Sequence, residues 1–117
     1  MRALVLDTNA LLMPFEVRLN LDLEVRRLLG DVRMVIPEPL IGELRRSRSK
    51  HAGAALALSE KYEKVPTVAR GDDAVIEAAL NLGAPVLTND KELRARLRAE
   101  GIQTIYLRSS RYLVKEG

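Results

Sequence analysis

The stretch RALVLDTN (Arg2–Asn9) is a short apolar run that ends directly in three polar side chains. Its apolar residues follow one another without polar alternation, which is typical of a β-strand buried on both faces. Such strands belong to parallel sheets that are covered by helices on both sides. Ligand sites in open α/β sheets form beyond the carboxyl ends of the strands. The position of Asp7 therefore makes it a candidate functional residue.

The rest of the chain alternates between strand and helix patterns. We expect further strands at residues 33–36, 85–88 and 103–107, and helices that begin near residues 10, 21, 39, 52, 72 and 90. Residues 65–68 fit an edge strand or a loop, because Pro66 lies within them. The alternation predicts an α/β three-layer sandwich, with a central parallel sheet of four to five strands flanked by helices. We expect one domain over residues 1–117, with a basic C-terminal tail at 108–117.

Composition narrows the possible functions. The 117 residues suit one domain with a real hydrophobic core, and 47% of them are apolar. Without Cys the chain has no disulfide, zinc thiolate or thiol nucleophile, which agrees with a reducing cytoplasm, and one His makes a His-based centre a poor explanation. The net charge of +3 permits a polyanionic partner. No stretch is long and apolar enough to suggest a signal peptide or a membrane span.

Four carboxylates fall where such a sheet would bring them together: Asp7, Glu43, Asp73 and Asp90. Each has an ordinary explanation when it is taken alone. Asp7 and Asp90 can cap helices, Glu43 can pair with the arginines that follow it, and Asp73 can complement a helix dipole. Capping does not require the four acids to converge, however, and converging acids repel each other unless a cation binds between them. The set therefore predicts a divalent metal site.

Helical spacing separates the paired acids at 72 and 73. Asp73 lines up with Ile76 and Leu80 on the packed face of its helix, whereas Asp72 points elsewhere and is the better N-cap. Farther along, Asn89 with Glu92 three residues later has the pattern of a capping box. Asn9 also stands where a phosphohydrolase with an aspartyl nucleophile needs its second Asp, which argues against that class.

These motifs resemble those of the PIN-domain family of metal-dependent ribonucleases over nearly the whole chain. VLDTNALL is similar to the opening strand with the first aspartate, and PLIGELRR to the helix with the second acid. DDAVIEAAL and VLTNDKEL resemble the third and fourth motifs. The ending LRARLRAEGIQTIYLRSSRYL is similar to archaeal PIN proteins related to ribosomal-RNA-processing nucleases, and more distantly to VapC toxins.

The resemblance implies a PIN-like fold and a Mg²⁺- or Mn²⁺-dependent endoribonuclease that cleaves single-stranded RNA to 3′-hydroxyl and 5′-phosphate ends. It implies that Asp7 and Asp90 are the core metal ligands, and that Asp73 and Glu43 are further or water-mediated ones. Second-sphere roles fall to Thr8, Asn9, Thr88 and Asp72. RNA processing or quality control, with a ribosome-assembly partner, is the implied role. A VapC-type toxin held by an antitoxin and a non-catalytic RNA-binding module are the alternatives.

Basic clusters supply the expected RNA contacts. The candidates are Arg45, Arg46, Arg48, Lys50, Arg108 and Arg111. Arg94 and Arg98, one helical turn apart, are better explained as ordinary surface. Few aromatic residues are present, so we expect salt-sensitive binding with weak sequence preference. The apolar cluster at residues 11–15 suggests either core packing or the face of a homodimer, and the family resemblance implies a homodimer.

Overall fold

The computed structural model describes residues 2–116, and the strands among them form one sheet in the order β3-β2-β1-β4-β5-β6. Their bounds are β1 Ala3–Leu6, β2 Arg33–Pro37, β3 Glu63–Val65, β4 Val86–Leu87, β5 Thr104–Arg108 and β6 Tyr112–Lys115. The open alternative at residues 65–68 is thereby resolved, because strand pairing ends at Val65, directly before Pro66. The predicted α/β sandwich is confirmed.

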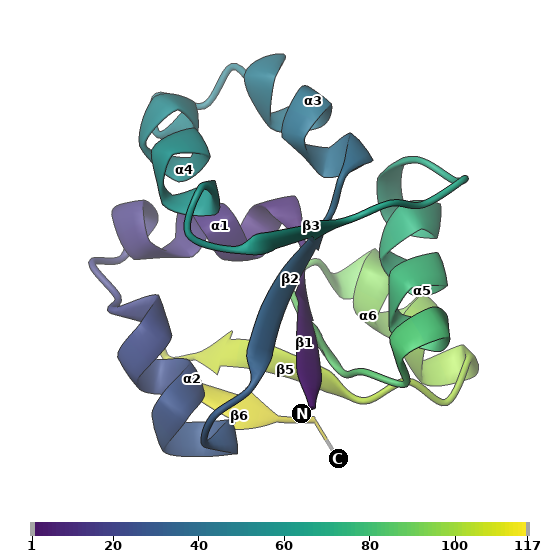
Figure 1. Ribbon diagram of the computed structural model, residues 1–117. Coiled ribbons are helices and arrows are strands. Elements are labelled where there is room, and N and C mark those ends of the chain that lie inside the picture. The colour runs from purple at the N-terminus through teal and green to yellow at the C-terminus, as the bar shows by residue number, and fades with distance from the viewer. Residues whose placement is uncertain (1, 117) are drawn as a thin grey trace.

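Helices cover both faces of this sheet. Their bounds are α1 Thr8–Glu16, α2 Leu21–Leu29, α3 Pro39–Arg45, α4 Ala52–Ser59, α5 Gly71–Leu82 and α6 Lys91–Ala99. Figure 1 shows α5 and α6 on one side of the sheet, and α1, α2 and α4 on the other. α3 contacts both α1 and α5, so it lies beside the edge of the sheet where the two helical layers meet.

The strand directions bring the carboxyl ends of five strands to one edge. β1 pairs in parallel with β2 on one side and β4 on the other, while β3 and β5 extend the sheet outward, also in parallel. All four residues of β1 are buried, as the apolar run predicts. Because the chain leaves β1 toward β2 and later returns to its other side at β4, the strand order reverses between β1 and β4. Crevices at such switch points are where α/β sheets bind ligands.

The C-terminal segment is more structured than the expected polar tail. Tyr112–Lys115 forms β6, which pairs antiparallel with β5 and makes the sheet one strand larger than the four to five expected. The turn between them is formed by Ser109 and Ser110, both with φ of 55°. Side chains with a Cβ seldom adopt that backbone conformation, and neither serine signals a turn as Gly or Asn would. The sequence pattern therefore did not reveal this hairpin.

The apolar cluster at residues 11–15 belongs to the core. Leu11 is 0% and Met13 3% exposed, while Leu12 and Phe15 pack partly buried against the same core. The core-packing alternative is therefore met at Leu11 and Met13. Exposed apolar side chains occur elsewhere, at Leu23 on α2 and Leu80 on α5. Within residues 2–116, no helix combines the length and the apolar character needed to cross a membrane.

Candidate active site

Asp7 occupies the switch point between β1 and β4. It follows β1 directly and caps α1, with its Oδ1 accepting a hydrogen bond from the Thr8 backbone N at 2.7 Å. Its Oδ2 accepts from the hydroxyl of Thr88 at 2.8 Å. Thr88 comes directly after β4 and is fully buried, and Asp7 itself is only 7% exposed. The strand ends thus hold a buried carboxylate in a fixed orientation.

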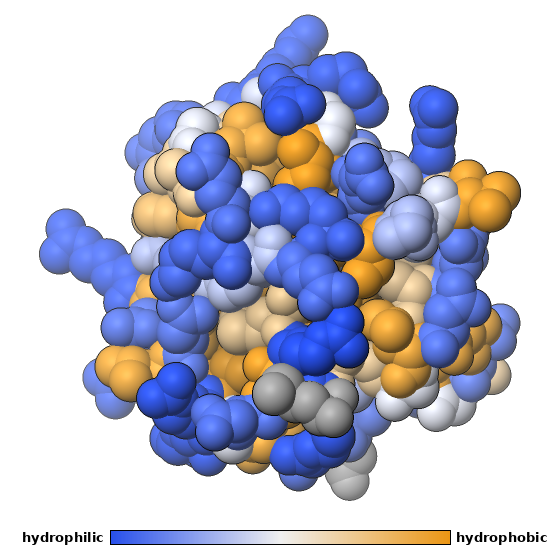
Figure 2. All heavy atoms as spheres, viewed as in Figure 1, coloured by the Kyte–Doolittle hydropathy of each residue, from blue (hydrophilic) through white to orange (hydrophobic). Residues whose placement is uncertain are grey.

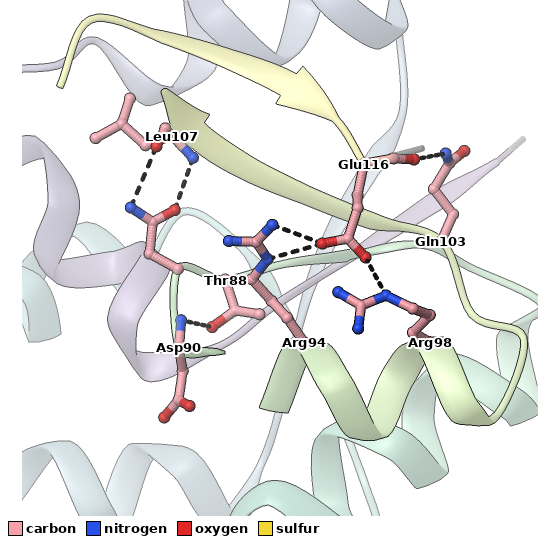
Figure 3. Close-up of polar contacts among 8 residues, drawn as sticks. Thr88, Asp90, Arg94, Arg98, Gln103, Leu107 and Glu116 are labelled. Atoms are coloured by element: carbon pink, nitrogen blue, oxygen red, sulfur yellow. Dashed lines mark hydrogen bonds and ion pairs between the residues drawn. The ribbon is translucent and has the colours of Figure 1, made fainter. Parts of the chain in front are cut away.

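Polar bonds tie Asp7 to the loop after β4. The Thr88 hydroxyl also accepts from the Asp90 backbone N at 3.1 Å (Figure 3). Its own proton is donated to Asp7. The side chain of Asn9 accepts from the Asn89 backbone N at 2.9 Å. In this way both polar residues predicted to orient the site, Thr88 and Asn9, fix the loop that carries Asp90.

The residue that caps α6 is Asp90, and Asn89 has another role. Asp90 is the N-cap of α6, since its Oδ1 accepts from the Leu93 backbone N at 3.0 Å. The Asn89 side chain instead accepts from the backbone N of Leu107 at 2.7 Å and donates to its carbonyl, so it clamps β5 to the loop after β4 (Figure 3). The expected cap at Asn89 is therefore wrong.

The electrostatics of this edge are unfavourable for Asp7. Burial, together with repulsion from Asp72 and Asp90, raises the pKa of Asp7 from 3.8 to about 6, although the hydrogen bonds from Thr88 and Thr8 act in the opposite direction. Burial, repulsion from Asp90 and further repulsion from Asp73 and Glu92 also raise the pKa of Asp72. Carboxylates that repel one another in a partly buried site are a mark of functional rather than structural placement.

The acid at the start of α5 that acts on Asp7 is Asp72. Asp73 is largely exposed and forms an ion pair with Arg96 of α6. α5 begins at Gly71, with Arg70 as the N-cap residue, so Asp72 lies in the first helical turn and is not the cap. The prediction that Asp73 lies on the packed face took Leu80 as buried, but Leu80 is 53% exposed. The side of α5 that carries Asp73 and Leu80 therefore faces outward, and Asp73 pairs there with Arg96 of α6. Neither Arg96 nor Glu92 was recognised from the sequence as part of this acidic region.

Glu43 lies at a different point on the same edge. Its Oε2 accepts a hydrogen bond from the Gly71 backbone N at 3.0 Å, which links α3 to the first residue of α5. The ordinary alternative for Glu43, a salt bridge with the arginines that follow it, is absent from residues 2–116. Glu43 therefore supports the segment that positions Asp72.

The donor chemistry of the site fits a hard divalent cation. Carboxylate oxygens are the ligands that Mg²⁺ and Mn²⁺ prefer, and mutual repulsion among Asp7, Asp72 and Asp90 would be relieved by one. The Thr8 hydroxyl is buried and has no hydrogen-bond partner within residues 2–116, so it is available to a bound ion or water. In the described conformation no three acidic or histidine side chains of that range are close enough to hold a metal ion. Binding would have to draw the carboxylates together.

The basic side chains form two groups. The expected RNA-binding residues are exposed and form no salt bridge among residues 2–116: Arg45, Arg46, Arg48, Lys50, Arg108 and Arg111. Arg94 and Arg98, by contrast, both pair with Glu116 (Figure 3), and Arg94 also lies 3.9 Å from the Tyr106 ring centroid. Their charges are therefore used within the fold.

The chain is similar in sequence to a PIN-like family model and to two ribonucleases. A family model described as a PIN-like domain matches residues 4–110. Ribonuclease VapC9 of Archaeoglobus fulgidus is 33% identical, with 98% of this chain and 90% of that protein covered. Ribonuclease VapC4 of Methanocaldococcus jannaschii is also 33% identical, over 96% of this chain and 95% of its own length.

Solved structures show the same fold. The PIN domain endonuclease Utp24 superposes with a TM-score of 0.84 at 22% identity, covering 97% of this chain and 90% of that one. A domain of a functionally unknown protein from Methanocaldococcus jannaschii superposes with a TM-score of 0.65 at 16% identity, covering 93% of each chain. At these identities the superpositions establish the fold alone. The similarity in sequence is to the two ribonucleases.

Proposed function

Because the chain belongs to the PIN domain family, we propose that it is a metal-dependent endoribonuclease that hydrolyses phosphodiester bonds of single-stranded RNA. One observation carries the proposal. Asp7 is a carboxylate at the switch point of the sheet whose pKa is raised by burial and, to a smaller extent, by the acids at 72 and 90. Such an arrangement costs stability without a cation and suits phosphoryl chemistry with one. The ribonuclease relatives, which span nearly the whole chain, supply the substrate class.

We assign Asp7 and Asp90 as the core ligands of Mg²⁺ or Mn²⁺, with Asp72 as the third acid. This replaces Asp73, which stays in an outlying role beside Arg96. Mg²⁺ or Mn²⁺, when bound, supplies the Lewis acidity that activates water and offsets charge on the phosphate. Thr88 holds Asp7 in place through its donated proton, and the unpaired hydroxyl of Thr8 is available to orient a water.

The hydrolysis itself forms one bond and breaks one. A water oxygen attacks the phosphorus and loses a proton, and the bond from phosphorus to the 3′ oxygen breaks. That oxygen takes up a proton, which leaves a 3′-hydroxyl and a 5′-phosphate. Glu43 keeps the first turn of α5, and with it Asp72, beside the reacting phosphate, while Asn9 does the same for the loop after β4. These two residues act by positioning.

RNA processing or quality control remains our proposed role, and the comparisons also favour a toxin. The two VapC-named relatives support an antitoxin partner, whereas the likeness to Utp24 concerns the fold. The two roles share their chemistry and differ in their partner. Growth arrest on expression, relieved by the product of a neighbouring small gene, would identify the toxin. Co-purification with ribosome precursors would identify the processing enzyme.

The proposed activity is tested with labelled single-stranded RNA in the presence of Mg²⁺, Mn²⁺ or EDTA. We expect internal cleavage with either metal and none in EDTA, and the new 5′ ends should be substrates for a 5′-phosphate-dependent exonuclease. Cleavage that persists in EDTA would contradict the metal assignment. Binding without cleavage under all three conditions would favour a non-catalytic RNA-binding module. Light scattering of the same sample tests whether the protein is the expected homodimer.

A further inference from the structure

A cleft of about 520 Å³ opens beside the acidic site, between α3 and the loop that joins β3 to α5. Gly42, Glu43 and Arg46 line one wall, and residues 66–68 with Arg70 line the other. Its volume lies within the roughly 300–1,000 Å³ of pockets that bind small molecules. Glu43 belongs to both places, because it lines the cleft and bonds the residue directly before Asp72. The cleft therefore adjoins the segment that carries Asp72.

The loop wall of the cleft is held rigidly by hydrogen bonds. The Glu77 carboxylate accepts from the backbone N of Val68 at 2.9 Å and of Ala69 at 3.0 Å. The Thr67 hydroxyl donates to the Ala69 carbonyl at 2.9 Å, and the Glu38 backbone N donates to the Val65 carbonyl at 2.8 Å. The cleft is thus formed before any ligand arrives, which lowers the entropic cost of binding.

These hydrogen bonds leave the side chain of Val68 exposed to solvent. Its side chain is 96% exposed on the lip of the cleft, the most exposed large apolar residue described. Figure 2 shows the corresponding apolar patch over the loop between β3 and α5, standing among hydrophilic side chains. An isolated exposed apolar side chain is ordinary by itself. Here it borders a formed cleft, where it can contact the face of a base.

The charges of the cleft suit a nucleotide. Arg46 and Arg70 line it, and neither forms a salt bridge or a side-chain hydrogen bond within residues 2–116, so both guanidinium groups can bind phosphate. The Glu38 carboxylate, at the same mouth, can accept from a ribose 2′-hydroxyl or a base amino group. A bare anion would gain little from a cleft that also carries two carboxylates, whereas a nucleotide matches both kinds of group.

We propose that this cleft binds one nucleotide of a single-stranded RNA next to the scissile phosphate, with Arg46 and Arg70 on its phosphates and Val68 against its base. The inference rests on the proposed ribonuclease function and adds the subsite that holds the strand. Arg108, the last residue of β5, and Arg111, in the turn that follows it, lie at the other end of the same sheet edge. The RNA then runs along the edge formed by the carboxyl ends of the parallel β-strands, from the hairpin of β5 and β6 to α3.

The test measures binding and does not depend on cleavage. Fluorescence anisotropy of a labelled eight-nucleotide RNA is recorded in EDTA with Asp7→Asn protein, which cannot cut it. Arg46→Ala with Arg70→Ala should weaken binding by about tenfold or more and reduce the slope of log affinity against log salt by about 1.4. The control is Arg26→Ala with Arg33→Ala, two arginines away from this edge that pair with Asp31 and Glu63, which should change affinity less than about twofold.

A second pair of variants excludes unfolding as the cause. Val68→Asp and Leu23→Asp each replace an exposed apolar residue with a charge, so neither should perturb the core. We expect Val68→Asp to weaken RNA binding at least about fivefold and Leu23→Asp to leave it unchanged. Equal affinities for the Arg46/Arg70 variant and its control, or no measurable RNA binding, would overturn the subsite. Cleavage by the unmodified protein is scored separately, so failure of the subsite and failure of the nuclease are distinguishable.

Discussion

The fold shifts the pKa values of two carboxylates, Asp7 and Glu116, in opposite directions. Hydrogen bonds from Arg98 and Arg94 lower the pKa of Glu116, which therefore stabilises the C-terminal end of the sheet. Burial and neighbouring acids raise the pKa of Asp7 to about 6, although two hydrogen bonds oppose the shift. A chain with 19 basic residues has enough arginine to neutralise both sites. Among residues 2–116, however, no basic side chain pairs with Asp7, so its charge is left for a bound cation.

The largest effect should come from removing the carboxylate at Asp7. Asp7→Asn keeps the shape and an acceptor for the Thr8 backbone N but loses the charge that holds the metal. Substitution of a residue that only orients a metal ligand lowers metal affinity or activity about 10- to 100-fold. Because Asp7 is proposed as a ligand itself, we expect RNA cleavage to fall at least about a hundredfold. Glu116→Gln is the matched control, with activity near that of the unmodified protein. Cutting by Asp7→Asn at the unmodified rate would remove Asp7 from the centre.

The same substitution should stabilise the metal-free protein above pH 6. The pKa of Asp7 is higher in the fold, about 6, than its ordinary 3.8. The ionised form is therefore disfavoured by folding, and stability is lost as the pH rises from about 4 through 6. At about 1.4 kcal/mol per pKa unit, the free energy of unfolding of Asp7→Asn relative to the unmodified protein should grow by about 3 kcal/mol over that range. Urea unfolding in EDTA measures it, and a difference independent of pH would disprove the shift.

Asp72 and Asp73 offer an internal comparison of neighbouring acids. Asp72 repels Asp7, whereas Asp73 pairs with Arg96, so Asp72→Asn should reduce cleavage about tenfold or more and Asp73→Asn clearly less. Single-turnover cleavage at saturating Mn²⁺ separates the two variants. A larger loss for Asp73→Asn would restore the assignment that helical spacing alone suggests.

The smallest effect is expected at Glu116. Its pKa in the fold lies below the ordinary 4.5, so its contribution is present at neutral pH and is lost as the pH falls through the folded-state pKa. Glu116→Gln should lower the free energy of unfolding by about 1 kcal/mol at pH 7, with little effect on cleavage. Thermal unfolding at pH 7 and pH 3 checks this, and an equal loss at both values would rule out the ionic contribution.

The fold followed from the sequence because hydrophobic periodicity and parallel connections leave few alternatives. The buried run before Asp7 and the apolar stripes of the helices were enough to order most of the sheet. The hairpin of β5 and β6 was missed because Ser109 and Ser110 take a backbone conformation that their residue type does not announce. The position of Asp7 could be predicted since it depends only on the end of a buried strand.

The choice between Asp72 and Asp73 could not be predicted in the same way. It depends on which side of α5 packs inward, where Leu80 proved to be exposed, and on Arg96, which comes from another helix and is brought close by tertiary packing. The capping role of Asn89 was mispredicted for a similar reason, because the Asn89 side chain bonds the backbone of Leu107, which lies on the distant strand β5. Local sequence patterns cannot predict site geometry that depends on contacts with residues distant in the sequence.

Calorimetric titration of Mn²⁺ into the unmodified protein, Asp7→Asn and Glu116→Gln tests the central claim most directly. If the repelling acids form the metal centre, the unmodified protein and Glu116→Gln will bind Mn²⁺ alike, with protons released at pH 6 as Asp7 ionises, and Asp7→Asn will lose most of the affinity. Mn²⁺ binding that survives in Asp7→Asn, or that disappears in Glu116→Gln, would contradict the division between a catalytic and a structural carboxylate.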